Sequence, residues 1–214
     1  MYDMDFDTWD TIYQKILSDF GFSRKEDERS AFILSDLLSS LSNTSDLSIL
    51  RKTINEKNIL VCGNAPSLVD DLKNFDFQDY AIIAADGAVE ALMDAGIVPD
   101  IIVTDLDGNV EKEIDANYKG SLMVVHAHGD NIDKLRKYVP RFKNVIGTTQ
   151  SHPLYNVYNF GGFTDGDRCV YLAKRFSASK IELAGFDFTD KNVSDFKRKK
   201  LKWAEWLINQ TTLL

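Results

Sequence analysis

Short apolar runs alternate with amphipathic stretches through most of the chain after residue 57. The apolar runs are rich in β-branched residues and predict buried strands, whereas several intervening stretches repeat apolar residues at helical spacing. Strands that alternate with helices are typical of α/β proteins whose sheet is mostly parallel and flanked by helices. The expected strands are 59–62, 80–84, 101–104, 121–125, 143–147 and 181–184, with 156–160 either a strand or an extended loop.

The N-terminal quarter of the chain has a different pattern. Trp9, Ile12, Ile16 and Phe20 follow one another at helical spacing, and a second amphipathic stretch comes after them. We therefore divide the chain into an N-terminal helical appendage, 1–57, and an α/β catalytic domain with a C-terminal helix, 58–214. The appendage is expected to pack on the sheet or on a second subunit, and a homodimer would suit its apolar faces.

A strand, a helix and a second strand are predicted within residues 80–109, and acids follow both strands. Asp86 comes after the first strand, and Asp105 and Asp107 come after the second. Parallel strands bring their carboxyl ends to one edge of the sheet, where ligands of such folds bind. Three neighbouring carboxylates predict a divalent cation, and oxygen ligands favour Mg²⁺. In the alternative interpretation Asp86 caps a helix and Asp107 with Gly108 forms a turn.

Polar residues also follow the other expected strands. They are Gly63, Asn64 and Ser67; His126, His128 and Asp130; Thr148 and Gln150; and Asp187. A glycine-rich loop, 161–168, adds Asp165 and Arg168 at the start of a helix. Glycine lets the backbone approach a ligand, and free N–H groups at a helix start attract phosphate. Turn formation and helix capping are the alternatives for these loops, and the acids near the histidines favour an oxygen-liganded ion over zinc.

Composition narrows the class of protein. The chain has 214 residues, 44% hydrophobic and 27% charged, which is ordinary for a globular protein. Its net charge of −8 argues against non-specific nucleic-acid binding, although the basic run 197–200 leaves an RNA-binding role as a weak alternative. No apolar run suits a membrane span, and the acidic N-terminus differs from a signal peptide, so we expect a cytoplasmic protein. Cys62 and Cys169 are too few for a disulfide framework or a Cys-rich zinc site.

The polar edge contains several carboxylates and few cations, with no evident Ser-His-Asp or Cys-His nucleophile. It therefore points to metal-assisted transfer at phosphorus. Several motifs of the chain also resemble those of known enzyme families. The motif 85–88 followed by 99–108, ADGA and PDIIVTDLDG, resembles the paired signature of thiamin pyrophosphokinases. The wider set is closer to archaeal 6-hydroxymethyl-7,8-dihydropterin diphosphokinases: GNAPS at 63–67, HAHGDN at 126–131, TTQ at 148–150, FGGFTDGDR at 160–168 and GFDF at 185–188.

This resemblance, which covers residues 58 to 214, implies a Rossmann-like fold similar to the thiamin pyrophosphokinase catalytic domain. It implies Mg²⁺-dependent transfer of diphosphate from ATP to the hydroxymethyl group of 6-hydroxymethyl-7,8-dihydropterin, leaving AMP, on a route to folate-type or methanopterin-type cofactors. From the requirements of this reaction we assign roles to the polar residues. The catalytic residues, which also bind the metal, are Asp105 and Asp107, with Asp86 as a third ligand or as a partner of the ligands. The residues expected to bind ATP are Gly63, Asn64, Ser67, Thr148, Gln150, Asp165 and Arg168. Those expected to bind the pterin are His126, His128, Asp130 and Asp187.

Other functions remain alternatives to this implied activity. Thiamin or another small alcohol could be the acceptor, because the motifs specify the donor better than the acceptor. A nucleotide-sensing domain without turnover is the alternative from the binding class. Among the carboxylates, Asp130, Asp165 and Asp187 are equal candidates for accepting hydrogen bonds from the amino group and ring N–H of a pterin.

Overall fold

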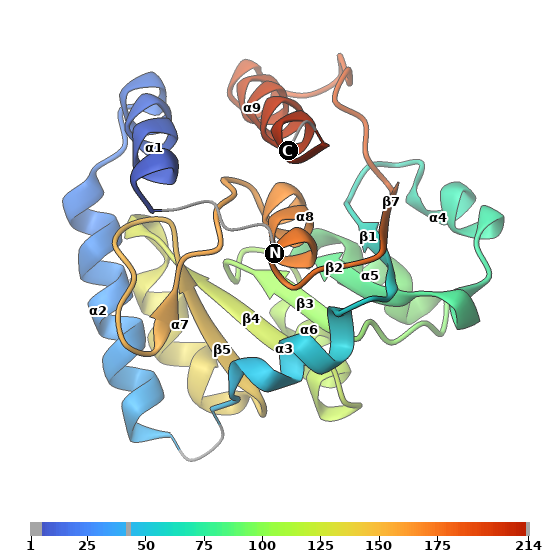
Figure 1. The fold of residues 1–214 in the computed structure, drawn as a ribbon, viewed down its shortest axis with the longest axis horizontal. Helices are drawn as coiled ribbons and strands as arrows, with labels where there is room; N and C mark the ends of the chain where they lie inside the picture. Colours follow the sequence, from blue (N-terminus) through green and yellow to red (C-terminus); the bar gives the residue numbers. More distant parts are fainter. Residues whose placement is uncertain (1–5, 42–43, 213–214) are drawn as a thin grey trace.

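The computed structural model describes residues 6–41 and 44–212. In this part of the chain one parallel sheet of seven strands has the order β6-β5-β4-β3-β2-β1-β7 (Figure 1). The predicted α/β fold with a parallel sheet is confirmed, and the uncertain segment 156–160 contains a two-residue strand. The strands are β1 Asn58–Cys62, β2 Ala81–Ala85, β3 Ile101–Thr104, β4 Leu122–Ala127, β5 Val145–Thr149, β6 Val157–Tyr158 and β7 Lys180–Ala184.

Three helices precede the sheet and the others connect or follow its strands. The α-helices are α1 Phe6–Phe20, α2 Arg24–Ser40, α3 Leu47–Ile54, α4 Leu68–Asp71, α5 Asp86–Asp94, α6 Val110–Tyr118, α7 Ile132–Tyr138, α8 Asp165–Arg175 and α9 Asp195–Thr212. Short 3₁₀ turns are η1 Leu72–Asn74, η2 Phe77–Asp79, η3 Gly129–Asn131 and η4 Val139–Arg141.

The order of the strands determines which face each connecting helix covers. From β1 to β5 the chain crosses the sheet in one direction, and right-handed connections then place α4, α5, α6 and α7 on one face. The chain then returns to β7, beside β1, and α8 lies on the opposite face. All strands run parallel, so their carboxyl ends share one edge.

Side chains alternate between two apolar cores along each strand, because successive residues of a strand point to opposite faces. In β4, Met123 and Val125 belong to the core beneath α5 and α6, whereas Leu122 and Val124 belong to the core beneath α8. Helices before β1 complete both layers. Leu34 of α2 is buried in the first core, and α3 contributes Leu50 and Ile54 to the second.

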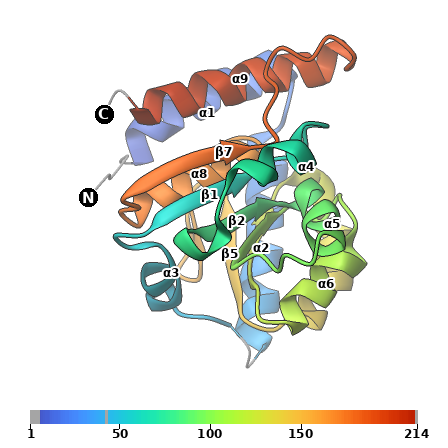
Figure 2. The ribbon, with the colours of Figure 1, turned by 90° about the vertical axis from the view of Figure 1, so that its right-hand side faces the viewer.

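Helices from the two ends of the chain lie side by side. Figure 2 shows α1 and α9 together across the sheet domain, next to α8. Trp9 and Tyr13 of α1 pack in one cluster with Tyr171 of α8 and Leu207 of α9. The N-terminal helices therefore pack on the sheet domain of their own chain, and the expected homodimer stays a prediction.

No helix in residues 6–41 and 44–212 combines the length and the hydropathy that a membrane crossing requires.

Candidate active site

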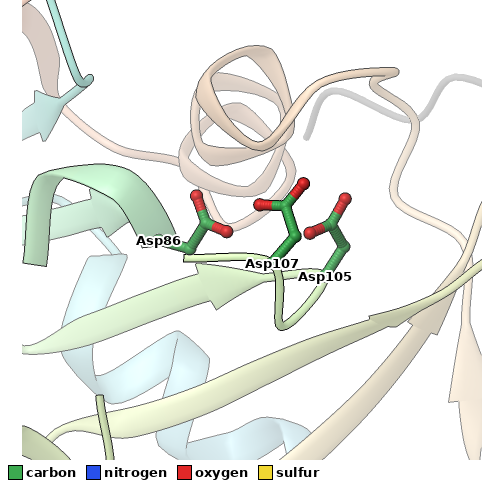
Figure 3. Close-up of side chains that lie close together, drawn as sticks. All are labelled: Asp86, Asp105 and Asp107. Atoms are coloured by element: carbon green, nitrogen blue, oxygen red, sulfur yellow. The ribbon is translucent and has the colours of Figure 1, made fainter. Parts of the chain in front are cut away.

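Three aspartates from two neighbouring strands form a cluster at the carboxyl edge of the sheet. Asp86 is the first residue of α5, directly after β2, and Asp105 and Asp107 lie in the loop after β3. One carboxylate oxygen from each residue lies within 4.8 Å of the others (Figure 3). The βα loops therefore bring together the three acids that the sequence singled out, at the spacing of ligands around a single cation.

The loop between Asp105 and Asp107 has an uncommon backbone conformation. Leu106 has φ of 67°, in the left-handed region that non-glycine residues rarely adopt. Its N–H donates to Thr104 Oγ1 at 2.8 Å, and its side chain is buried in the core. Burial of this leucine offsets the strain of the turn, and the turn places both aspartates at the cluster.

The carboxylates of the cluster differ in their affinity for protons. Burial and the negative charge of Asp165 raise the pKa of Asp86 to about 10. Burial also acts to raise the pKa of Asp105, but the hydrogen bond and charge of His128, together with the charges of Arg168 and Lys200, outweigh it, and the pKa is lowered to about 2. Without a cation the site therefore holds Asp86 protonated beside an ionised Asp105.

Two oxygens of the cluster are left without hydrogen bonds. Among the described residues, Asp86 Oδ2 and Asp105 Oδ1 are buried and have no hydrogen-bond partner. A buried oxygen without a hydrogen bond is costly, most of all on the ionised Asp105, and coordination of a cation by both carboxylates would remove that cost. The donor set of oxygen ligands fits Mg²⁺.

A histidine and an asparagine hold Asp105 from the β4 side. His128 Nε2 lies 3.2 Å from Asp105 Oδ2. Asn131 Nδ2 donates to the backbone carbonyls of Asp105 at 3.0 Å and His126 at 2.7 Å, and its Oδ1 accepts from the His128 N–H at 3.1 Å. The side chain of His126 is fully buried behind this layer, with Nδ1 3.2 Å from Thr148 Oγ1. Burial keeps the pKa of His126 well below its usual range, so this imidazole is neutral.

Arg168 lies in the first turn of α8 and faces the cluster from the opposite side. Its Nη1 is 3.2 Å from Asp165 Oδ1, and its Nη2 donates to Gln150 Oε1 at 3.0 Å. The start of α8 is fixed by Asp167, whose Oδ1 accepts from the N–H groups of Phe163 and Thr164. Burial raises the pKa of Asp165 well above its ordinary value, and the charge of Asp105 acts in the same direction. Arg168 thus supplies a buried positive charge beside the acidic cluster.

Gln150 links this arginine to the N-terminal helices. Its Nε2 donates to Asp27 Oδ2 at 2.8 Å, and its backbone carbonyl accepts from Trp9 Nε1 at 2.8 Å. Asp27 also accepts from the Tyr13 hydroxyl at 2.6 Å and from the Gly129 N–H at 2.8 Å. Asp27 is not among the site residues predicted from the sequence. Asp27 lies on the same face of α2 as Ala31, Leu34 and Leu38. An acid at a position where the helical spacing calls for an apolar residue indicates that it is buried.

A cavity of about 350 Å³ opens beside Asp105 and Arg168. Its walls come from the loop before α2, the η3 turn, the start of α8 and α9. The lining residues are Gly21, Phe22, Ser23, Glu26, Asp27, Asp105, His128, Gly129, Asp130, Gln150, Phe163, Arg168, Phe196 and Lys200. Of the predicted pterin residues, His128 and Asp130 line this cavity.

Four of the predicted residues, Gly63, Asn64, Ser67 and Asp187, do not line this cavity. At the end of β1, Asn64 lies against the first turn of α5, because a Cβ at Gly87 would be 2.4 Å from its Nδ2. Ser67 Oγ donates to Asp71 Oδ2 at 2.9 Å. Asp187 is exposed after β7, and its Oδ1 accepts from the N–H and hydroxyl of Thr189. Gly63 packs closely against the Gly185 carbonyl, which leaves no room for a side chain.

The fold and the acidic edge define an α/β protein with a candidate metal and phosphate site. A family model described as 6-hydroxymethylpterin diphosphokinase MptE-like matches residues 34–193. The chain belongs to this MptE-like family.

Three relatives have the same name, 6-hydroxymethyl-7,8-dihydropterin pyrophosphokinase. The relative from Methanocaldococcus jannaschii is 42% identical over 96% of this chain and 95% of its own length. The relative from Pyrococcus furiosus is 44% identical over the same shares of the two chains. The relative from Methanothermobacter thermautotrophicus is 46% identical over 86% of this chain and 79% of its own length. The resemblance deduced from the motifs is confirmed.

Proposed function

We propose that this protein transfers the terminal diphosphate of ATP to the hydroxymethyl group of 6-hydroxymethyl-7,8-dihydropterin, giving AMP and the pterin diphosphate. The names of three relatives and the family support this activity. The observation that carries it is the cluster of Asp86, Asp105 and Asp107 beside a cavity that also contains Arg168.

The reaction requires one bond to form and one to break at the β-phosphorus of ATP. The acceptor hydroxyl oxygen attacks this phosphorus and loses its proton to water, and the bond to the α-phosphate oxygen breaks as AMP leaves. Charge develops on the phosphoryl oxygens and on the leaving group, so catalysis depends mainly on positioning and electrostatics.

The acidic cluster would hold Mg²⁺, and the ion would neutralise charge on the triphosphate. Asp105 and Asp107 are the proposed metal ligands, and Asp86 is proposed as a third ligand. His128 and Asn131 keep Asp105 in place through the contacts described above. Arg168 offsets charge on AMP as it leaves. The residues proposed to surround the nucleotide are Gly63, Asn64, Ser67, Thr148 and Gln150. The nucleotide would reach the cluster across the carboxyl ends of the strands.

Product analysis tests the proposal. The protein is incubated with ATP, Mg²⁺ and each of several acceptors: 6-hydroxymethyl-7,8-dihydropterin, thiamin and a simple sugar. We expect AMP and a pterin diphosphate in equal amounts when the pterin is the acceptor, and no product with thiamin or the sugar. Formation of ADP would contradict diphosphate transfer, turnover of thiamin would reassign the acceptor, and nucleotide binding without any AMP would indicate a nucleotide-sensing domain.

A further inference from the structure

The cavity beside Asp105 is lined in part by segments that contain none of the predicted site residues. Residues at the start of α2 line part of it, and residues in the N-terminal part of α9 line another part. Figure 1 shows α9 above α8, with α2 along the left side of the molecule. Cavities of a few hundred Å³ with aromatic walls and a few polar groups are typical of small-molecule sites. Its volume of about 350 Å³ therefore suits an acceptor of the size of a bicyclic ring.

Phenylalanine rings make the apolar part of this cavity. The ring centroid of Phe22 lies 6.4 Å from that of Phe163 and 6.3 Å from that of Phe196. Phe196 is 52% exposed although it lines the cavity, which is unusual for a large apolar side chain beside other aromatic rings. A flat heteroaromatic ligand would cover this surface and contact the ring faces.

Asp27 supplies a buried carboxylate to the lining of this cavity. It is 4% exposed, and its donors Tyr13, Gln150 and the Gly129 N–H are all uncharged. Two of these hydrogen bonds use Oδ2 and one uses Oδ1, so Oδ1 has capacity for one more donor. An N–H from a ligand in the cavity would complete the set.

We infer that the acceptor binds in this cavity, with its ring against Phe22 and Phe196 and with an amino or ring N–H donating to Asp27 Oδ1. This assignment rests on the proposed function, because it places the acceptor hydroxyl beside Asp105 and Arg168, which line the same cavity. Residues 21–27 of the N-terminal helical segment are then part of the substrate site.

Asp27 fits this role better than the three carboxylates considered from the sequence. Asp165 is engaged by the guanidinium of Arg168, and Asp187 is exposed and does not line the cavity. Asp130 does line the cavity, but it is exposed at the η3 turn. A hydrogen bond to a buried carboxylate discriminates between ligands more strongly than one to a carboxylate in water.

The test is Asp27→Asn, with Tyr13→Phe as the matched control. Both variants weaken the contacts that hold α1 to α2, but Tyr13→Phe keeps the carboxylate. Calorimetry with 6-hydroxymethylpterin and steady-state kinetics should show that Asp27→Asn raises the Kd and KM of the pterin about 10- to 100-fold, the range for a hydrogen bond to a charged group. The KM for ATP should stay within about threefold in both variants, and the pterin Kd of Tyr13→Phe should also stay within about threefold. Equal effects of the two variants on pterin binding, or none, would overturn the inference.

A second pair of variants covers the case in which Asp27→Asn does not fold. Phe196→Ala and Trp206→Ala each remove an exposed aromatic ring from α9, but only Phe196 lines the cavity. Phe196→Ala should raise the pterin Kd about tenfold and Trp206→Ala should leave it unchanged, and equal values would overturn the inference. Failure of the proposed function alone is recognised separately, because wild-type protein would then bind pterin without forming AMP, and absence of pterin binding in the wild type would overturn both.

Discussion

Arg168 Nη1 donates a hydrogen bond to Asp165 Oδ1, one turn earlier at the start of α8, at 3.2 Å. Both side chains are largely buried, and a buried pair of this kind needs further hydrogen bonds to offset desolvation. Gln150 provides one of them to Arg168, and the guanidinium Nε has no hydrogen-bond partner within the described residues. The arginine is therefore fixed in place and retains a donor for a ligand.

We predict that Arg168→Gln lowers kcat at least 100-fold. The substitution removes the buried positive charge that would stabilise the leaving AMP, and the loss of one well-placed donor in such sites costs about 100- to 1,000-fold. Steady-state AMP formation at saturating Mg²⁺ measures the effect. Lys174→Gln is the control, since it removes one positive charge near the other end of α8, beside Ala178 and Ser179. Retention of wild-type kcat in Arg168→Gln would remove this residue from the mechanism.

Asp105→Asn and Asp107→Asn should each abolish measurable turnover without unfolding the protein. Each replacement takes one anionic ligand from the cluster, so the affinity for Mg²⁺ falls with the activity. The thermal shift on addition of Mg²⁺ provides a readout independent of catalysis, and we expect it to disappear in both variants. Asp115→Asn serves as the control because Asp115 pairs with Lys119 on the surface of α6. Full activity in either cluster variant would contradict the metal assignment.

Stability should fall with rising pH when no divalent cation is present. The pKa of Asp86 is about 10 in the folded protein and 3.8 ordinarily, so between these values the folded state holds a proton that the unfolded state lacks. The free energy of unfolding then decreases by at most about 1.4 kcal/mol per pH unit from this group. Addition of Mg²⁺ should flatten this dependence, because it stabilises the ionised carboxylate.

Melting temperatures between pH 6 and pH 9, in EDTA or in Mg²⁺, measure this effect. Burial also raises the pKa of Glu113 to about 7, and this group contributes a decrease of the same sign. The comparison is therefore made between wild type and Asp86→Asn, in which the contribution of Asp86 is absent and that of Glu113 remains. Identical pH dependence in the two proteins would show that Asp86 is ionised without the cation.

The local chemistry of the sheet edge could be predicted from the sequence because it depends on short segments. Each strand end carries its polar residues within a few positions, and parallel pairing alone brings Asp86 and Asp105 to one edge. The position of Asp27 could not be predicted in this way. It depends on how α2 packs beside the η3 turn, and its contacts with Gly129 and Gln150 span more than 100 residues.

The outer layer of the fold was also beyond sequence analysis for a physical reason. Helical spacing identified the apolar faces of the N-terminal and C-terminal helices, but spacing does not identify the partner of an apolar face. The contacts of Trp9 and Leu207 with Tyr171 determine that partner. Likewise, Asp187 follows a strand as predicted, but its carboxylate accepts hydrogen bonds from Thr189 in the adjacent loop.

Gly87→Ala should weaken ATP binding while leaving α5 intact. A Cβ at this position would lie 2.4 Å from Asn64 Nδ2, so the side chain of Asn64 has to move. Alanine is favoured over glycine within a helix by about 1 kcal/mol, and we therefore expect no loss of stability. Because Asn64 is a proposed nucleotide residue, the KM for ATP should rise about tenfold, the effect of losing about 1.4 kcal/mol of binding.

A double-mutant cycle separates this mechanism from a general disturbance of the metal cluster, since Gly87 also adjoins Asp86. In the Asn64→Ala background the amide is removed and the added methyl group meets only the Cβ at position 64, at 3.0 Å, so Gly87→Ala should change the KM for ATP by less than about twofold. Additive effects would mean that the methyl group acts through Asp86 instead, and the Mg²⁺-dependent thermal shift of Gly87→Ala would then also be reduced. An unchanged thermal shift together with non-additive KM values would place Asn64 at the nucleotide.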